Sequence, residues 1–275
     1  MKIAVYQART GIDPKANAVD LEKAVAEAAR GGAAMLFTPE MSGLLDRDRS
    51  RAASHIAREE DDPVLAAVRD AARREKIWVH IGSLALASGE AGGRLSNRGF
   101  VIDGEGTIRA RYDKMHLFDV DLPTGESWRE SAAYVAGSRP VVVETPVGRL
   151  GLSICYDIRF PDLYRTLTNA GATVLAIPAA FTVPTGKAHW HVLLRARAIE
   201  AGAFVVAAAQ AGRHEDGRET YGHSLVVDPW GHILLDMETE PGVGFAELDL
   251  DRVRDVRARV PAIDHRRDIG EPELL

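Results

Sequence analysis

The feature that most constrains the fold is a pattern that occurs twice: a helical segment, a small-residue turn, a short apolar run and a proline. The first copy ends in Gly31-Gly-Ala-Ala-Met-Leu-Phe-Thr-Pro39 and the second in Ala170-Gly-Ala-Thr-Val-Leu-Ala-Ile-Pro178. A helix followed by a buried strand is typical of α/β folds. Two copies predict two sheets of related build that pack face to face with helices outside, although two such short matches can also arise by chance.

Other segments fit this α/β pattern. Two hairpins are predicted, one around Asp103-Gly-Glu-Gly106 and one around Asp228-Pro-Trp-Gly231. The segment 118–137 shows little regularity, which predicts a long surface loop. No shift in composition divides the 275 residues. We therefore expect one domain over residues 1–275, with a C-terminal arm or tail from roughly residue 262 to 275.

The composition excludes several classes of protein. With 46% hydrophobic and 27% charged residues, it is typical of a soluble globular chain, and no apolar run is long enough to span a membrane. The formal net charge of −6 gives no reason to expect a nucleic-acid partner. A single cysteine permits no internal disulfide, and residues 2–7 resemble a strand more than a signal peptide. We expect a cytoplasmic protein.

Cys155, the only cysteine, lies where a strand-like run gives way to a helix signal at Pro161-Asp162. Such a junction can present a nucleophilic thiol beside free backbone N–H groups, and the N–H of Tyr156 is a natural oxyanion donor there. The alternative is a buried, inert cysteine, because free cysteine is among the most buried residue types.

Two charged residues also follow predicted strands: Glu40 after residues 33–37, and Lys114 after residues 107–112. If these strand ends meet Cys155, Glu40 could take the thiol proton, and desolvation would raise the pKa of Glu40. Lys114 could then stabilise an oxyanion. The spacing does not require this meeting, since Glu40 could be a solvated loop residue and Lys114 a surface partner of a nearby aspartate.

Three segments in this order resemble the signature segments of the nitrilase superfamily of carbon–nitrogen hydrolases: Phe37-Thr-Pro-Glu40, Tyr112-Asp-Lys-Met-His-Leu-Phe118 and Gly151-Leu-Ser-Ile-Cys-Tyr-Asp157. The resemblance implies that Glu40 is the general base, Lys114 the oxyanion stabiliser and Cys155 the nucleophile that forms a thioester. It also implies that Glu130 positions the lysine and the substrate. The implied fold is a four-layer α-β-β-α sandwich of two mixed sheets. The resemblance also implies a homodimer or higher homo-oligomer that needs no metal or other cofactor.

Finer segments, among them Ala188–Glu200 and Tyr221–Ser224, resemble the deaminated glutathione amidases of the Nit branch. That resemblance implies an amide substrate bearing a carboxylate, cut to 2-oxoglutarate and cysteinylglycine. The alternatives are an ω-amidase acting on 2-oxoglutaramate or succinamate, an N-carbamoyl amino acid hydrolase, or, outside the enzymes, a redox-sensing thiol protein. Lys187 stands where the branch usually has proline, and it could alter the pocket mouth.

Three further residues are candidates for substrate binding. Arg159 follows the predicted nucleophile by four residues, and related carbamoylases carry a carboxylate-binding arginine at the matching position. The alternative is an ion pair of Arg159 with Asp157 or Asp162. His116 and His189 could orient Lys114 or line the pocket, or they could be structural histidines.

Overall fold

The computed structural model describes residues 1–89, 93–121, 125 and 127–274, and it contains two large mixed β-sheets. The first sheet has the order β17 (Gly242–Glu247), β1 (Lys2–Gln7), β2 (Met35–Phe37), β3 (Trp78–Ala87), β4 (Leu95–Ile102) and β5 (Ile108–Asp113), with β8 (Tyr134–Val135) also paired to β4. The second has the order β16 (Ile233–Asp236), β15 (Leu225–Val227), β12 (Phe204–Ala207), β11 (Val174–Ala176), β10 (Gly148–Leu152) and β9 (Val141–Thr145).

The two sheets are built alike. In each, three central strands run parallel (β1, β2 and β3, or β10, β11 and β12), and antiparallel strands flank them. The register also corresponds, since Ile3 is opposite Met35 in the first sheet and Leu150 is opposite Val174 in the second. The duplicated helix–strand–proline pattern of the sequence therefore reflects two related halves of the fold.

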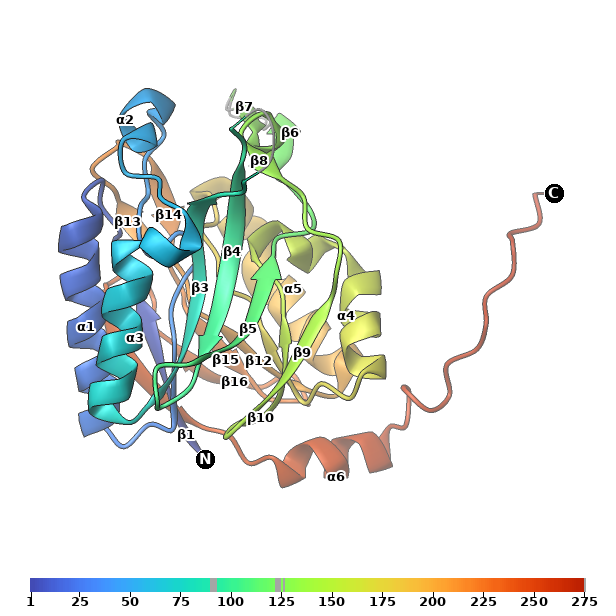
Figure 1. Cartoon of the computed structure of the whole chain (residues 1–275). Coiled ribbons are helices and arrows are strands. Elements are labelled where there is room, and N and C mark those ends of the chain that lie inside the picture. The colour runs from blue at the N-terminus through green and yellow to red at the C-terminus, as the bar shows by residue number, and fades with distance from the viewer. Residues whose placement is uncertain (90–92, 122–124, 126, 275) are drawn as a thin grey trace.

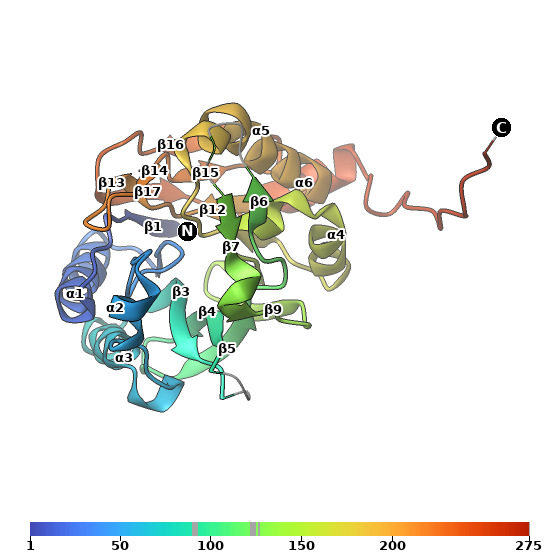
Figure 2. The same ribbon diagram turned by 90° about the horizontal axis from the view of Figure 1, so that it is seen from above.

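Helices cover the two outer faces (Figures 1 and 2). Helices α1 (Pro14–Arg30) and α3 (Pro63–Glu75) lie on the first sheet, and α4 (Pro161–Asn169) and α5 (Val183–Ala201) lie on the second. Both α1 and α3 begin at a proline behind an aspartate whose side chain accepts a backbone N–H of the first turn. The predicted α-β-β-α sandwich is confirmed.

Strand alternation decides which residues face which layer. In β2, Leu36 packs with α1 and α3, whereas Met35 and Phe37 belong to the cluster between the sheets with Leu150 and Leu152. The contact between the two sheets is therefore mainly apolar, and the charged side chains of the site lie at the ends of its strands.

The shorter elements lie in the connections. They are α2 (Arg49–Ala53), η1 (Glu59–Asp61), β6 (Asp119–Asp121), β7 (Ser127–Arg129), η2 (Glu130–Ala132), η3 (Cys155–Arg159), β13 (Ala211–Arg213) and β14 (Glu219–Tyr221). The prediction of an irregular loop over 118–137 is partly wrong, because β6 pairs with β7 to form a hairpin. An ion pair between Arg129 and Asp121, at 2.9 Å, stabilises this hairpin. Residues 122–124 and 126 of the segment lie outside the described residues.

The chain ends in α6 (Asp251–Arg259), after which residues 261–274 contain no helix or strand. Arg266 in this segment donates to Thr168 and Asn169 of α4, and the chain beyond it runs away from the sandwich in both views (Figures 1 and 2). Within the described part of the chain, no helix combines the length and apolar character that a bilayer span requires.

Candidate active site

The carboxyl ends of β2, β5 and β10 bring three side chains from distant parts of the chain together. Lys114 Nζ lies 2.8 Å from Glu40 Oε1, and the Cys155 thiol is hydrogen-bonded to the Glu40 carboxylate. The residues Lys114, Glu40 and Cys155 are only 2%, 4% and 7% exposed, respectively. Glu40 is therefore not a solvated loop residue, and Lys114 is not a surface partner of a nearby aspartate.

Cys155 sits on a sharp turn between β10 and the 3-10 helix η3. Its φ is 51°, in the left-handed region that non-glycine residues avoid at a cost of roughly 1–2 kcal/mol. The turn is held on both sides, because the Cys155 N–H donates to the Pro178 carbonyl (2.8 Å) and the Ile154 N–H to Asp157 Oδ2 (2.8 Å). Backbone strain that the surroundings fix in this way is typical of functional positions.

The strand ends beneath Glu40 approach each other too closely for any side chain at Gly82 in β3. A Cβ on Gly82 would lie 2.3 Å from the Thr38 carbonyl oxygen and 2.4 Å from Pro178 Cβ. Thr38 precedes Glu40 by two residues and belongs to the first half, whereas Pro178 belongs to the second. Gly82 thus permits the two halves to meet directly below the site.

A second carboxylate completes the ionic group. Glu130, at the start of η2, places Oε2 2.9 Å and Oε1 3.1 Å from Lys114 Nζ, and its Oε2 accepts the Phe118 N–H at 2.7 Å. The Asn97 side-chain amide donates to Glu40 Oε1 (3.0 Å) and to Glu130 Oε1 (3.1 Å). The buried ammonium is therefore held between two carboxylates whose own positions are fixed.

Asn97 lies in β4, is fully buried, and was not singled out in the sequence. The signal that could have found it is asparagine inside a strand, where that residue type is depleted. A buried amide needs hydrogen-bond partners, and the two carboxylates are the partners of the Asn97 NH2 group, whereas its Oδ1 is buried without a partner among the described residues.

The ionic arrangement sets the protonation states at rest. Burial alone would lower the pKa of Lys114, but the charges of Glu130 and Glu40 raise it well above its ordinary value. Burial alone would raise the pKa of Glu40, but the charge and hydrogen bond of Lys114 lower it. The expectation of a raised Glu40 pKa was wrong, because it did not include this ammonium.

Burial and the nearby Glu40 charge together raise the pKa of the Cys155 thiol well above its usual range, and Lys114 offsets only part of this. One ammonium between two carboxylates carries a net negative charge, which disfavours a thiolate. The resting site therefore consists of a neutral thiol beside an ionised carboxylate, which is the arrangement that general-base activation requires.

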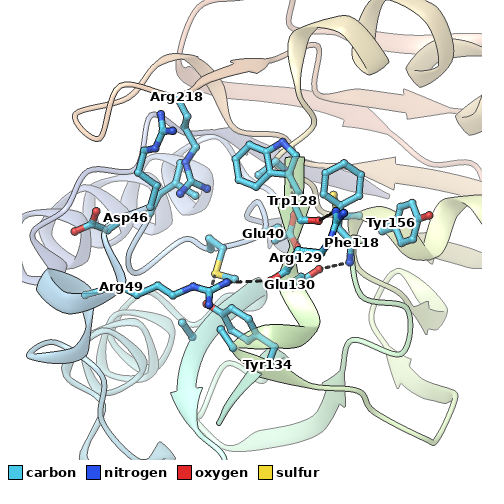
Figure 3. Close-up of a pocket in the computed structure, with 18 of the residues that line it drawn as sticks. Glu40, Asp46, Arg49, Phe118, Trp128, Arg129, Glu130, Tyr134, Tyr156 and Arg218 are labelled. Carbon is cyan, nitrogen blue, oxygen red and sulfur yellow. Dashed lines mark hydrogen bonds between the residues drawn. The ribbon is translucent and has the colours of Figure 1, made fainter. Parts of the chain in front are cut away.

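These groups open onto a cavity of about 1380 Å³. In Figure 3, Arg218, Asp46 and Arg49 lie on one side of it and Phe118 and Tyr156 on the other, with Glu40 and Glu130 between them. Tyr156 is the second residue of η3, directly after Cys155, and the first N–H groups of such a turn have no partner within it. Among the described residues, the lining is rich in arginine, with six arginines and Lys114 against four acidic residues.

Arg159 lines the cavity and is not paired with an aspartate. Its guanidinium lies 5.6 Å from the Phe181 ring and 3.3 Å from His189 Nδ1, and no carboxylate of the described residues forms an ion pair with it. Asp157 instead accepts the Tyr112 hydroxyl at 2.7 Å and the Ile154 N–H. The alternative of an Arg159 ion pair with Asp157 or Asp162 is therefore wrong.

The structure does not bring the other candidates into the cavity. His116 is held by Asp157 at 2.7 Å and stacks on Phe160, so it is a structural histidine and its predicted contact with substrate is wrong in this geometry. His189 is also absent from the lining, and its Nδ1 lies 3.3 Å from Arg159 Nη1. Lys187 is exposed and absent from the lining, although Thr185 in the same helix turn contributes to it.

Trp128 is a lining residue that the sequence did not indicate. Its indole N–H is buried without a hydrogen-bond partner among the described residues, and the Arg218 guanidinium lies 5.4 Å from its ring. A buried donor without a partner is costly in a protein, so this N–H is available to a bound molecule. Within the described residues, the group of side chains that could share a metal ion does not line this cavity.

Comparison with known proteins yields consistent relatives. A family model described as carbon-nitrogen hydrolase matches residues 2–258. A deaminated glutathione amidase of Yersinia enterocolitica is 36% identical, covering 98% of this chain and 93% of that protein.

Solved structures agree with this. The crystal structure of the C. elegans NitFhit protein has a TM-score of 0.89 and 38% identity, with 97% of this chain covered and 65% of that one. A mutant of the amidase from Nesterenkonia sp. AN1, which shows the result of Michael addition of acrylamide at the active-site cysteine, has a TM-score of 0.78 and 29% identity, with 95% and 98% covered.

Proposed function

Because this chain belongs to the carbon–nitrogen hydrolase family, we propose that Cys155, Glu40, Lys114 and Glu130 hydrolyse an amide through a thioester on Cys155. The resemblance to the nitrilase superfamily is confirmed, and the chain is a hydrolase of amide carbon–nitrogen bonds other than peptide bonds. The observation that carries the proposal is a buried cluster in which the Cys155 thiol is hydrogen-bonded to the Glu40 carboxylate and that carboxylate is paired with the Lys114 ammonium.

In the first step the Cys155 sulfur attacks the amide carbonyl while Glu40 takes the thiol proton. The carbonyl oxygen becomes an oxyanion that Lys114 Nζ and the Tyr156 N–H stabilise. Glu40 then gives its proton to the amide nitrogen, the C–N bond breaks, and the amine leaves. Glu130 and Asn97 act through Lys114 and Glu40, whose positions they fix.

In the second step water attacks the thioester carbonyl and Glu40 accepts a proton from that water. The C–S bond breaks, the carboxylic acid product is released, and the thiolate regains the proton from Glu40. The Ala180 N–H, 3.0 Å from Glu40 Oε2, holds the carboxylate in place through both steps. The cycle balances with water as the sole co-reactant and needs no cofactor.

For the substrate we propose deaminated glutathione, cut to 2-oxoglutarate and cysteinylglycine. This molecule carries a carboxylate at each end, and the cavity offers arginines near Cys155 (Arg159) and farther out (Arg49 and Arg218). Its volume of about 1380 Å³ exceeds the roughly 300–1,000 Å³ of ordinary small-molecule sites, which favours a tripeptide-sized substrate over a small monoamide. The Trp128 N–H is a further donor for its distal part.

The test is a substrate panel of deaminated glutathione, 2-oxoglutaramate, succinamate and N-carbamoyl amino acids, with products and the acyl adduct on Cys155 followed by mass spectrometry. The proposal predicts cysteinylglycine release with the highest kcat/KM of the panel. Faster turnover of a monoamide or an N-carbamoyl amino acid would refute this substrate while leaving the amidase chemistry intact.

The role of Arg159 can be separated from that of nearby charge. We expect Arg159→Met to raise KM for a carboxylate substrate by about tenfold or more, because a bidentate charge-assisted contact contributes on the order of 1.5–3 kcal/mol. Lys187→Met is the matched control, since Lys187 is an exposed cation outside the lining. Equal KM values in the two variants would contradict the assignment.

We also propose a cytoplasmic homodimer. Large apolar side chains remain exposed on α5 and on the adjacent hairpin: Val192, Ile199, Trp230, Ile233 and Leu234. An apolar patch of this kind is typical of an interaction surface. Light scattering coupled to size-exclusion chromatography tests the dimer, and Val192→Lys is expected to dissociate it.

A further inference from the structure

Outside the cavity, three potential metal ligands converge from separate elements. They are His191 on α5, His223 between β14 and β15, and Asp236 at the end of β16. Their ligand atoms all lie within 4.8 Å of one another. None of the three lines the active-site cavity or takes part in the proposed reaction.

One ring nitrogen of each histidine lies close to a different oxygen of the Asp236 carboxylate. His191 Nε2 lies 3.1 Å from Asp236 Oδ2, and His223 Nδ1 lies 2.9 Å from Asp236 Oδ1. Two imidazole nitrogens and one carboxylate oxygen form a ligand set that suits Zn²⁺ and its neighbours in the transition series. We infer that His191, His223 and Asp236 form a binding site for a divalent transition-metal ion of the Zn²⁺ type.

The ligands are held in place before any ion binds. His223 has a φ of 53°, its N–H donates to the Glu238 carbonyl, and its own carbonyl accepts the Trp190 indole N–H at 2.7 Å. The Tyr221 ring stacks on the His223 ring with centroids 4.5 Å apart. Asp236 Oδ1 also accepts the Glu238 N–H at 2.9 Å. Fixed outer contacts of this kind orient metal ligands and strengthen binding.

The local charge also favours a cation. The only ion-pair partners of Asp236 among the described residues are the two histidines, which are neutral when they bind metal. In the single chain the side chains of His191, His223 and Asp236 are 31%, 21% and 29% exposed, which leaves room beside them for an ion and a coordinating water.

A second histidine–aspartate pair on the same hairpin provides a matched control. His232 Nδ1 lies 3.2 Å from Asp228 Oδ2, but that oxygen also accepts the Arg252 guanidinium at 2.7 Å. Arg252 already pairs with this carboxylate, and the His232–Asp228 pair has no third potential ligand among the described residues. His232 should therefore not contribute to metal binding.

An ion at this site would connect three parts of the fold. It would link α5 and β16 to the segment after β14, and Glu219 and Thr220 of β14 line the cavity. The Tyr221 N–H already donates to the carbonyl of Phe181, another lining residue. The expected role is a structural clamp beside the cavity wall, independent of the reaction at Cys155.

The test uses tag-free, chelator-treated protein in the Cys155→Ser background, so that the active-site thiol cannot hold metal. Co²⁺ binding is followed by its visible absorption, and Zn²⁺ by competition against Co²⁺. We expect one ion per chain, an affinity at least about tenfold weaker in His191→Gln and in Asp236→Asn, and no change in His232→Gln. Zn²⁺ should also raise the Tm of the parent protein and of His232→Gln only.

His191 and Asp236 are the preferred positions because the strained backbone at His223 makes its variants harder to interpret. Unchanged affinity in His191→Gln and Asp236→Asn would overturn the proposal, as would the absence of saturable binding. Half an ion per chain would also overturn it, because the ion would then lie between two chains and not among these three ligands.

Discussion

The ends of the central strands in the two sheets occupy corresponding places but carry different residues. By register, Ala8 after β1 corresponds to Cys155 after β10, and Glu40 after β2 corresponds to Ala179 after β11. The first half therefore supplies the carboxylate and the second half supplies the thiol. In each case the corresponding position of the other half is an alanine. The duplicated backbone provides the positions, whereas residue choice at four of them provides the chemistry.

The hairpins that follow show the reverse case, in which the counterparts agree. Asp103 accepts the N–H groups of Glu105 and Thr107, and Asp228 accepts those of Trp230 and His232. Gly106 and Gly231 both have positive φ, at 76° and 88°. The two halves therefore use the same residue types where they form a turn, and they differ in residue type at the strand ends that form the site.

The largest effect is expected at the thiol. Cys155→Ala introduces alanine, the residue type of the corresponding position Ala8 in the first half. We expect amide turnover to fall below detection, because no covalent intermediate can form. Turnover is measured by product release, and circular dichroism with substrate binding checks that the fold and the cavity persist. Residual turnover close to that of the unmodified protein would rule out the thioester scheme.

The next largest effect is expected at the acid. Glu40→Gln keeps the shape but cannot take a proton, so kcat/KM should fall by about 10²–10⁴-fold. In the unmodified protein the pKa of Glu40 is lowered by Lys114, so activity should persist as pH falls through the usual range of a glutamate and be lost only below it. Glu105→Gln, on the exposed surface, is the control. An acid limb near pH 6–7 would indicate a different base.

The close approach of the two halves gives a stability prediction. His80 of the first sheet corresponds by register to Val206 of the second. Two residues farther along each strand, Gly82 therefore corresponds to Ala208. Gly82→Ala should destabilise the fold by about 1–3 kcal/mol or more in urea unfolding, because its Cβ would overlap backbone atoms of Thr38 and Pro39. The reverse change, Ala208→Gly, should cost less, on the order of 1 kcal/mol. A smaller loss for Gly82→Ala than for Ala208→Gly would contradict this account.

Much of this frame could be predicted from local patterns. Strand alternation, helix starts at Asp-Pro and the two turns with aspartate and glycine depend on neighbouring residues, and the structure contains all of them. The contacts of the site could not be predicted in this way. Lys114 lowers the pKa of a glutamate 74 residues away, and Asn97 joins carboxylates from two other segments. Such couplings exist only after the chain has folded.

Near neutral pH the smallest effect is expected at a buried histidine that the second half replaces with valine, because its cost to stability develops only on acidification. His80 in β3 pairs with Phe37 as Val206 pairs with Ala176, and burial lowers the pKa of His80 to about 3. Between the ordinary value of 6.5 and about 3, the unfolded chain binds a proton that the folded chain does not, so stability falls as pH decreases through this window. His80 contributes a slope of at most about 1.4 kcal/mol per pH unit to the free energy of unfolding.

Urea unfolding at several pH values tests this contribution. His80→Val should remove that part of the acid sensitivity, while Val79→Ile, one residue away, should keep it. If the two variants lost stability equally on acidification, His80 would not be the buried neutral group described above.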